Sequence, residues 1–138
     1  MKAAPASGIL LFAHGARDPR WAEPFHRMIA KLHARRADIP AQVAFLEHME
    51  PDLETAIGWL AAKGVERITL LPLFMGRGGH LQRDLPELVA RACEAHPGVV
   101  VRTTEALGEV DALLEAITGW VLDEHDSTGS VDLGHPVA

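Results

Sequence analysis

The chain has 138 residues, enough for one domain with a hydrophobic core, and its length gives no reason to expect two domains. Hydrophobic residues make up 48% and charged residues 23%, a balance that is typical of globular proteins and excludes a disordered chain. The formal net charge of -6 argues against a protein that grips the phosphates of nucleic acid, so no nucleic-acid partner is expected.

The first half of the chain alternates strand-like and helix-like patterns. Residues 8–13 form an apolar run that predicts a strand, and residues 42–46 form a second one. Between them, apolar residues recur at helical spacing: Trp21, Phe25, Met28, Ile29 and Leu32. Pro24 must lie in the first turn of this helix, where a missing N–H costs little. A second helix opens near Pro51 and ends at Gly64.

The second half repeats the alternation. Residues 67–74 and 99–103 predict the third and fourth strands, and a glycine-rich loop at 76–79 follows the third. The helix between them carries an apolar side: Leu85, Leu88, Val89 and Ala92. The last helix shows the same spacing: Val110, Leu113, Leu114, Ile117 and Val121. From residue 123 to 138 the sequence becomes polar, and we expect a flexible tail.

These elements predict one α/β domain over residues 1–122. The strands are nearly continuous apolar runs, which indicates a sheet covered by helices on both faces. Short links between alternating strands and helices predict a doubly wound, mostly parallel, four-stranded sheet. Right-handed crossovers favour the flavodoxin-like order 2-1-3-4, in which strands one and three are neighbours at the switch point where such sheets bind ligands.

Three side chains that can bind metal follow three of the predicted strands: His14, Glu47 and His80. Two imidazoles and a carboxylate suit divalent transition metals, or they could serve as general acids and bases. Each residue also has a structural alternative, because a histidine can cap a helix or sit in a core, and Glu47 could favour a helix N-terminus. The predicted topology brings the two histidines together at the carboxyl ends of the first and third strands.

Cationic side chains gather around the same loops. Arg17, Arg77 and Arg83 would suit a small anionic ligand, although each one could equally be solvated loop charge. Asp18 and Asp84 precede helical residues and are predicted to be N-caps.

The cysteine content and the hydropathy of the chain indicate the cellular compartment in which the protein is expected. Cys93 is the only cysteine, so no disulfide or cysteine-based zinc site is expected, and a buried, unreactive thiol is predicted. The N-terminus lacks a signal-peptide core, and no apolar stretch approaches the roughly 18 residues of a membrane span. The sequence therefore predicts a cytoplasmic protein without a membrane partner.

Over residues 8–122 the sequence resembles a known family. The matching motifs are His-Gly-x-Arg-Asp-Pro at 14–19, Phe-Leu-Glu at 45–47 and Pro-Leu-Phe-x-x-x-Gly-x-His-x-x-x-Asp-x-Pro at 72–86, followed by Ala-Leu-Gly at 106–108. In these motifs the chain resembles the class II tetrapyrrole chelatases of the sirohydrochlorin cobaltochelatase or ferrochelatase type, in their short form. It departs from the common Gly-His-Gly-Ser-Arg pattern at Ala13 and Ala16.

The resemblance implies that Co²⁺ or Fe²⁺ is inserted into sirohydrochlorin, in cobalamin or siroheme synthesis, with the metal as substrate and no organic cofactor. It implies that His14, His80 and Glu47 bind the metal and move the pyrrole protons. We expect Arg17, Arg77 and Arg83 to bind substrate carboxylates. Longer relatives hold two copies of this unit, so one copy implies a homodimer.

Two other functions stay open from the residues themselves. A non-catalytic cobalt or nickel carrier could use the same His/Glu site. A small acid/base hydrolase could use His14 and His80, but the chain has no nucleophile elbow, so it ranks last.

Overall fold

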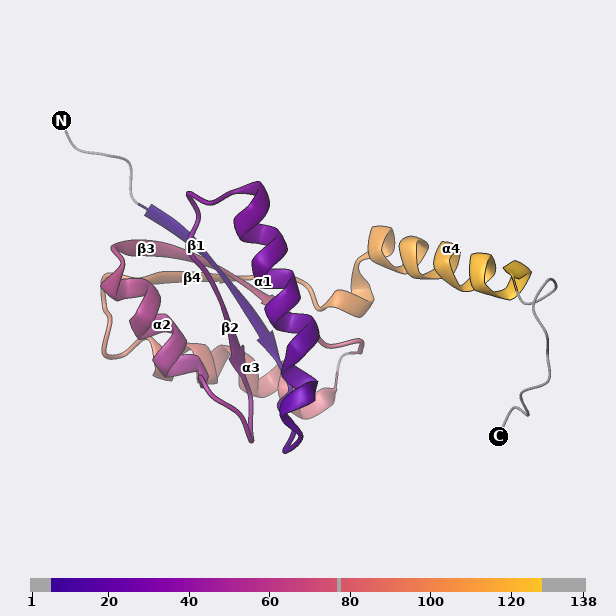
Figure 1. The fold of residues 1–138 in the computed structure, drawn as a ribbon. Coiled ribbons are helices and arrows are strands. Elements are labelled where there is room, and N and C mark those ends of the chain that lie inside the picture. Colours follow the sequence, from indigo (N-terminus) through magenta and orange to yellow (C-terminus); the bar gives the residue numbers. More distant parts are fainter. Residues whose placement is uncertain (1–5, 77, 128–138) are drawn as a thin grey trace.

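A computed structural model describes residues 6–76 and 78–127, with the side chains of all of these except Gly79, His80 and Gln82. Strands and helices alternate along the described chain (Figure 1). In order, the elements are β1 (Ala6–Ala13), η1 (Pro19–Ala22), α1 (Glu23–Arg35), β2 (Ala41–Phe45), α2 (Leu53–Ala62), β3 (Val65–Pro72), α3 (Gly79–Ala92), β4 (Val100–Thr103), η2 (Leu107–Glu109) and α4 (Asp111–Ser127). No helix in this described part is long and apolar enough to cross a membrane.

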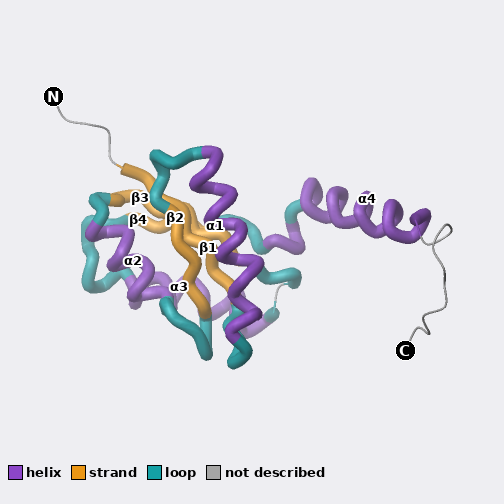
Figure 2. Tube along the Cα trace, in the orientation of Figure 1, coloured by secondary structure: helices purple, strands orange, loops and turns teal. Residues whose placement is uncertain are grey.

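The four strands form one parallel sheet in the order β2-β1-β3-β4, which confirms the predicted fold (Figure 2). β1 lies between β2 and β3, with Ala13 paired to Phe45 and Phe12 paired to Pro72. The strand order reverses at β1, so the switch point lies between the carboxyl ends of β1 and β3.

Apolar side chains fill both faces of the sheet, as continuous apolar strands require. One face packs against α2 and α3 through a cluster that includes Leu10, Ile57, Leu60, Ile68 and Leu70. The other face packs against α1 through a smaller cluster that includes Leu11, Val43, Phe45, Phe25 and Ile29. Cys93 is half-buried rather than fully buried as predicted; it packs beside the larger cluster, and this burial raises the pKa of its thiol.

Local sequence signals explain where the helices begin. Pro24 lies in the first turn of α1, as predicted, and the carboxylate of Asp52 caps α2 by accepting the N–H of Thr55 at 2.8 Å. Asp84 was predicted to be an N-cap, and this prediction is wrong. α3 already begins at Gly79 because Gly78 has the extended backbone of a cap residue, so Asp84 lies inside the helix.

Two boundaries differ from expectation. β3 begins at Val65, directly after Gly64 turns the chain with a positive φ of 86°, and it ends at Pro72 rather than at Phe74. α4 continues past residue 122 to Ser127, and the remainder of the predicted tail, 128–138, lies outside the described residues. The more consequential difference is that α4 stands clear of the sheet (Figure 1), although its apolar spacing resembles that of a packed helix.

Candidate functional site

Backbone hydrogen bonds continue between β1, β2 and β3 just past the carboxyl ends of these strands. Leu46 donates its N–H to Ala13 at 2.8 Å, and Leu73 donates its N–H to Phe12 at 2.7 Å. His14 follows β1 directly, so it emerges between the two neighbouring strands. This is the crevice at which open α/β sheets bind ligands.

Glycine at position 15 allows the loops after β1 and β2 to meet. A Cβ built on Gly15 would overlap the carbonyl oxygen of Glu47 and come within 3.2 Å of Met49 Cγ. The β2 loop presents that carbonyl in a tight turn, in which Met49 donates its N–H to Glu47 at 2.8 Å and His48 has a positive φ of 63°. Only a residue without a side chain fits at this contact.

The close approach pairs the first histidine with the predicted acid. His14 Nδ1 lies 3.6 Å from Glu47 Oε1, and both side chains are half-exposed. At this separation a small shift brings both atoms onto one metal ion, or lets the carboxylate accept a proton from the imidazole. The structure therefore brings together two of the three predicted metal ligands.

Two aromatic residues hold His14 in place. The His14 ring packs edge-on against Phe74, with centroids 4.6 Å apart, and Phe74 is itself buried against Phe12. Trp21 donates its indole N–H to the carbonyl of His14 at 2.7 Å. Sequence reasoning assigned Trp21 to a core stripe and gave Phe74 no role. The available signal was the position of Phe74 as the last residue of the predicted third strand, at the carboxyl end of the sheet.

The third predicted ligand, His80, lies in the first turn of α3, which follows β3. The sheet order places the end of β3 beside that of β1, so the backbone topology supports a shared mouth for His14 and His80. The His80 side chain and all of Arg77 lie outside the described residues. Among the side chains that are described, no three His, Cys, Asp or Glu residues gather around a common point.

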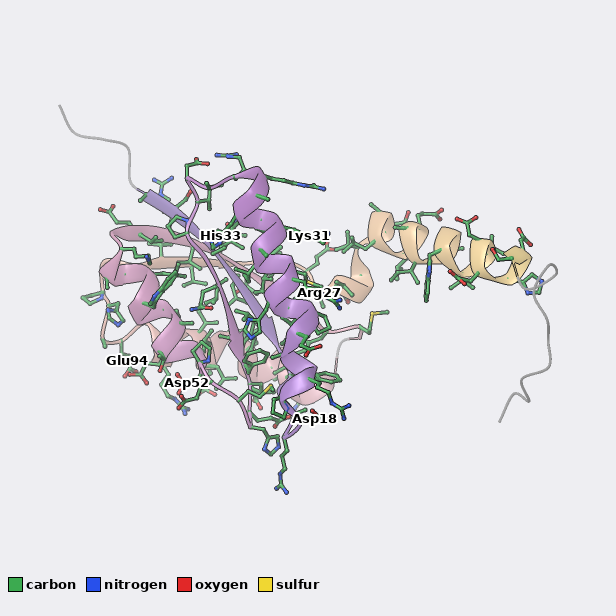
Figure 3. All side chains as sticks on the ribbon, in the orientation of Figure 1. Asp18, Arg27, Lys31, His33, Asp52 and Glu94 are labelled. Atoms are coloured by element: carbon green, nitrogen blue, oxygen red, sulfur yellow. The ribbon has the colours of Figure 1, made fainter. Side chains whose placement is uncertain are left out.

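The arginines near the site differ in whether an acidic side chain already binds them. Arg17 follows the His14 loop and Arg83 lies in α3, and both are exposed and form no ion pair with a described residue. Arg20 is occupied, because its guanidinium binds the Asp18 carboxylate at 2.7 Å. This pairing holds the pKa of Asp18 below its usual value, and Asp18 caps η1 as predicted, near the start of α1 (Figure 3).

A groove of about 610 Å³ opens beside this site. It lies between α3 and the carboxyl ends of β3 and β4, and it reaches Phe74, the residue that contacts His14. Its walls are largely apolar and include Leu81, Leu85, Pro86, Val89 and Val101, while Glu105 adds a carboxylate. This volume falls within the range of sites that bury small organic ligands.

Comparison with known proteins finds a matching family and similar curated proteins. The CbiX family matches residues 8–123. A sirohydrochlorin cobaltochelatase from Methanothermobacter thermautotrophicus is 38% identical over 85 residues, which are 62% of this chain and 59% of that protein. Another from Methanosarcina acetivorans is 31% identical over 83 residues, 60% of this chain and 64% of that protein. The matched region thus spans less than two thirds of these relatives.

Solved structures share the fold over a longer stretch. A CbiX protein from Marinobacter aquaeolei superposes with a TM-score of 0.75 and 34% identity, covering 88% of this chain and 98% of that one. The sirohydrochlorin chelatase SirB from Bacillus subtilis subspecies spizizenii, in complex with cobalt, gives a TM-score of 0.72 at 24% identity, covering 86% of this chain and 50% of that one. At that identity, the second likeness concerns the fold alone.

Proposed function

This chain belongs to the CbiX family, and from that premise we propose that it inserts a divalent metal ion, Co²⁺ or Fe²⁺, into sirohydrochlorin. The observation that carries the proposal is the pair of His14 and Glu47, held 3.6 Å apart at the switch point of the sheet and beside an apolar groove. The metal is a substrate, and the proposal includes no organic cofactor.

Insertion exchanges two protons for one metal ion. The two pyrrole N–H groups of the macrocycle lose their protons, and the four nitrogens bind the ion. In our proposal His14, Glu47 and His80 hold the incoming ion, and the imidazoles accept the departing protons. Both tasks require a neutral imidazole, because a protonated ring can neither bind the ion nor accept a proton.

The surroundings suggest how the macrocycle lies. Sirohydrochlorin is rich in carboxylates, which would be repelled by Glu105 in the groove and attracted by arginines on the rim. We therefore assign a face of the flat ring to the apolar walls of the groove between α3 and β4, and the carboxylates at its periphery to Arg17, Arg83 and Arg77. Arg17 and Arg83 are available for this task because no described acidic residue pairs with them.

The proposed working form is a homodimer in the cytoplasm. A flat macrocycle is larger than the walls that one such unit provides, and a second copy would supply the opposite wall. The product would serve cobalamin or siroheme synthesis, according to the metal inserted.

The test is the anaerobic absorbance of sirohydrochlorin mixed with Co²⁺, with and without the protein. We expect the protein to accelerate the spectral change and His14→Ala to abolish that acceleration. His33→Ala removes an exposed histidine from α1 and is the matched control, for which wild-type rates are expected.

The other outcomes separate the rival functions. Tight Co²⁺ binding without acceleration would replace the chelatase with a metal carrier. Hydrolysis of an anionic substrate that survives exhaustive chelation would favour the acid/base enzyme instead.

A further inference from the structure

The loop after β2 contains a residue whose backbone has the left-handed conformation. His48 has a φ of 63°, and no other non-glycine residue in the described part of the chain has a positive φ. Met49 donates its N–H to the carbonyl of Glu47 at 2.8 Å, so these three residues form a γ-turn with His48 at its centre. A side chain disfavours this conformation, which persists only where the surrounding structure imposes it.

Packing on both faces of the sheet imposes the turn. Leu46 packs against the cluster with α2 and α3, and Met49 packs against the cluster with α1. These clusters lie on opposite sides of the sheet, so the chain crosses from one side to the other between positions 46 and 49. Glu47 and His48 alone make that crossing, and both are exposed. So short a connection requires a sharp turn of the backbone.

Hydrogen bonds at the base of the loop fix both of its ends. Phe45 donates its N–H to the carbonyl of Pro51 at 2.9 Å, and Leu46 donates its N–H to the carbonyl of Ala13 at 2.8 Å. The first bond closes the loop between β2 and α2, and the second ties the loop to the end of β1. The residues between these bonds therefore cannot relax the turn by shifting along the strand.

The turn faces the loop that carries His14. The Glu47 carbonyl that accepts the Met49 N–H is also the group that a Cβ on Gly15 would overlap. The peptide group of Glu47 is thus held between the turn and the Gly15 backbone. The Glu47 side chain leaves from the same residue, and its Oε1 lies 3.6 Å from His14 Nδ1. The direction of the carboxylate therefore depends on the backbone conformation at position 48.

We propose that His48 is a positioning residue, whose left-handed backbone aims the Glu47 carboxylate at His14 so that both bind one metal ion. The role belongs to the backbone conformation and not to the imidazole. Histidine, asparagine and aspartate adopt a positive φ more often than other side chains, whereas a β-branched residue is strongly disfavoured there. This role rests on the metal pair of the proposed function, but it requires neither the tetrapyrrole nor His80.

The test compares substitutions that all remove the imidazole but differ in the φ that they allow. His48→Asn and His48→Gly accept a positive φ, and His48→Val does not. Co²⁺ affinity is measured by calorimetry without tetrapyrrole. We expect His48→Asn and His48→Gly to bind Co²⁺ within about twofold of the wild type. His48→Val should bind it at least about tenfold more weakly, as when a residue that orients a metal ligand is lost.

A double substitution determines whether His48 acts through the carboxylate. In a Glu47→Ala background, His48→Val should weaken Co²⁺ binding no further, because the group that the turn positions is already absent. His33→Val removes an exposed histidine from α1 and is the matched control, for which wild-type affinity is expected. Urea unfolding verifies that each variant is folded, and His48→Thr is a second β-branched variant should His48→Val unfold.

Three results would overturn the positioning role. Equal losses of Co²⁺ affinity in His48→Asn, His48→Gly and His48→Val would indicate that the imidazole itself binds the ion. Wild-type affinity in His48→Val, or a further loss in the Glu47→Ala background, would indicate that the turn does not act through Glu47. A wild type that binds no Co²⁺ would remove the metal pair on which the role depends.

These measurements separate the positioning role from the chelatase. If the affinities differ as expected but the protein does not accelerate metal insertion into sirohydrochlorin, the proposed function fails and the positioning role stands. If His48→Val inserts metal at the wild-type rate with unchanged Co²⁺ affinity, the positioning role fails and the proposed function stands.

Discussion

Adding one methyl group at Gly15 should damage the site more than the fold. The Cβ of Gly15→Ala would occupy the position of the Glu47 carbonyl oxygen and would lie 2.9 Å from the carbonyl carbon. Relief of that overlap requires the loops after β1 and β2 to move apart by on the order of 1 Å. Overpacking of this kind costs about 1–3 kcal/mol of the free energy of unfolding.

The same movement separates His14 from Glu47, whose side chains already lie 3.6 Å apart. A misplacement of roughly 1 Å in a catalytic group can lower a rate by about 100-fold. We therefore expect Gly15→Ala to remain folded, to bind Co²⁺ more weakly and to insert metal about 100 times more slowly than the wild type.

Three measurements check this prediction: urea unfolding for stability, calorimetry for Co²⁺ binding and absorbance for insertion. Gly98→Ala is the matched control, because a Cβ at Gly98 meets no atom within 4 Å. Its stability should change by less than about 0.5 kcal/mol, with wild-type activity. Wild-type Co²⁺ affinity and turnover in Gly15→Ala would refute the argument that this glycine sets the geometry of the pair.

Three further features of the molecule can each be probed by substitution. Asp52→Ala should lower the free energy of unfolding by about 1 kcal/mol through loss of the α2 cap. The Thr55 N–H lowers the pKa of Asp52, so its contribution is present above the ordinary pKa of an aspartate and is lost as the pH falls; urea unfolding of wild type and Asp52→Ala should converge in acid. Phe74→Ala should cost about 3–5 kcal/mol in the same assay, because this ring is buried in the core. Arg17→Ala should raise the KM for sirohydrochlorin, whereas Arg20→Ala should leave it unchanged because Arg20 is bound to Asp18; equal KM values for the two variants would contradict our assignment of Arg17.

The order of strands and helices could be predicted from the chain because it depends on short-range patterns. Apolar runs and helical spacing marked the elements, and the handedness of crossovers left one natural strand order. That order places His14 at the switch point, since the residue after a strand must emerge at the strand's carboxyl end. The roles of all six predicted site residues in metal and substrate binding stay predictions: His14, Glu47, His80, Arg17, Arg77 and Arg83.

Contacts between distant segments could not be read in this way. Nothing in the residues around position 15 indicates that its glycine touches Glu47, because this contact depends on how two loops pack after the sheet has formed. The ring of Phe74 against His14 is a similar case. Both decide the geometry of the site, and both join residues far apart in the chain.

α4 is the clearest case in which the sequence could not predict the packing. Its apolar spacing predicts a helix that buries one side, but periodicity contains no information on which surface receives that side. The turn at Gly108 directs the helix away from its own sheet. This turn is held by two hydrogen bonds between separate strands and loops, in which Thr104 donates its N–H to Leu70 and Gly108 donates its N–H to Phe74. Local patterns determine which residues need to be covered, whereas the packing of the whole domain determines what can cover them.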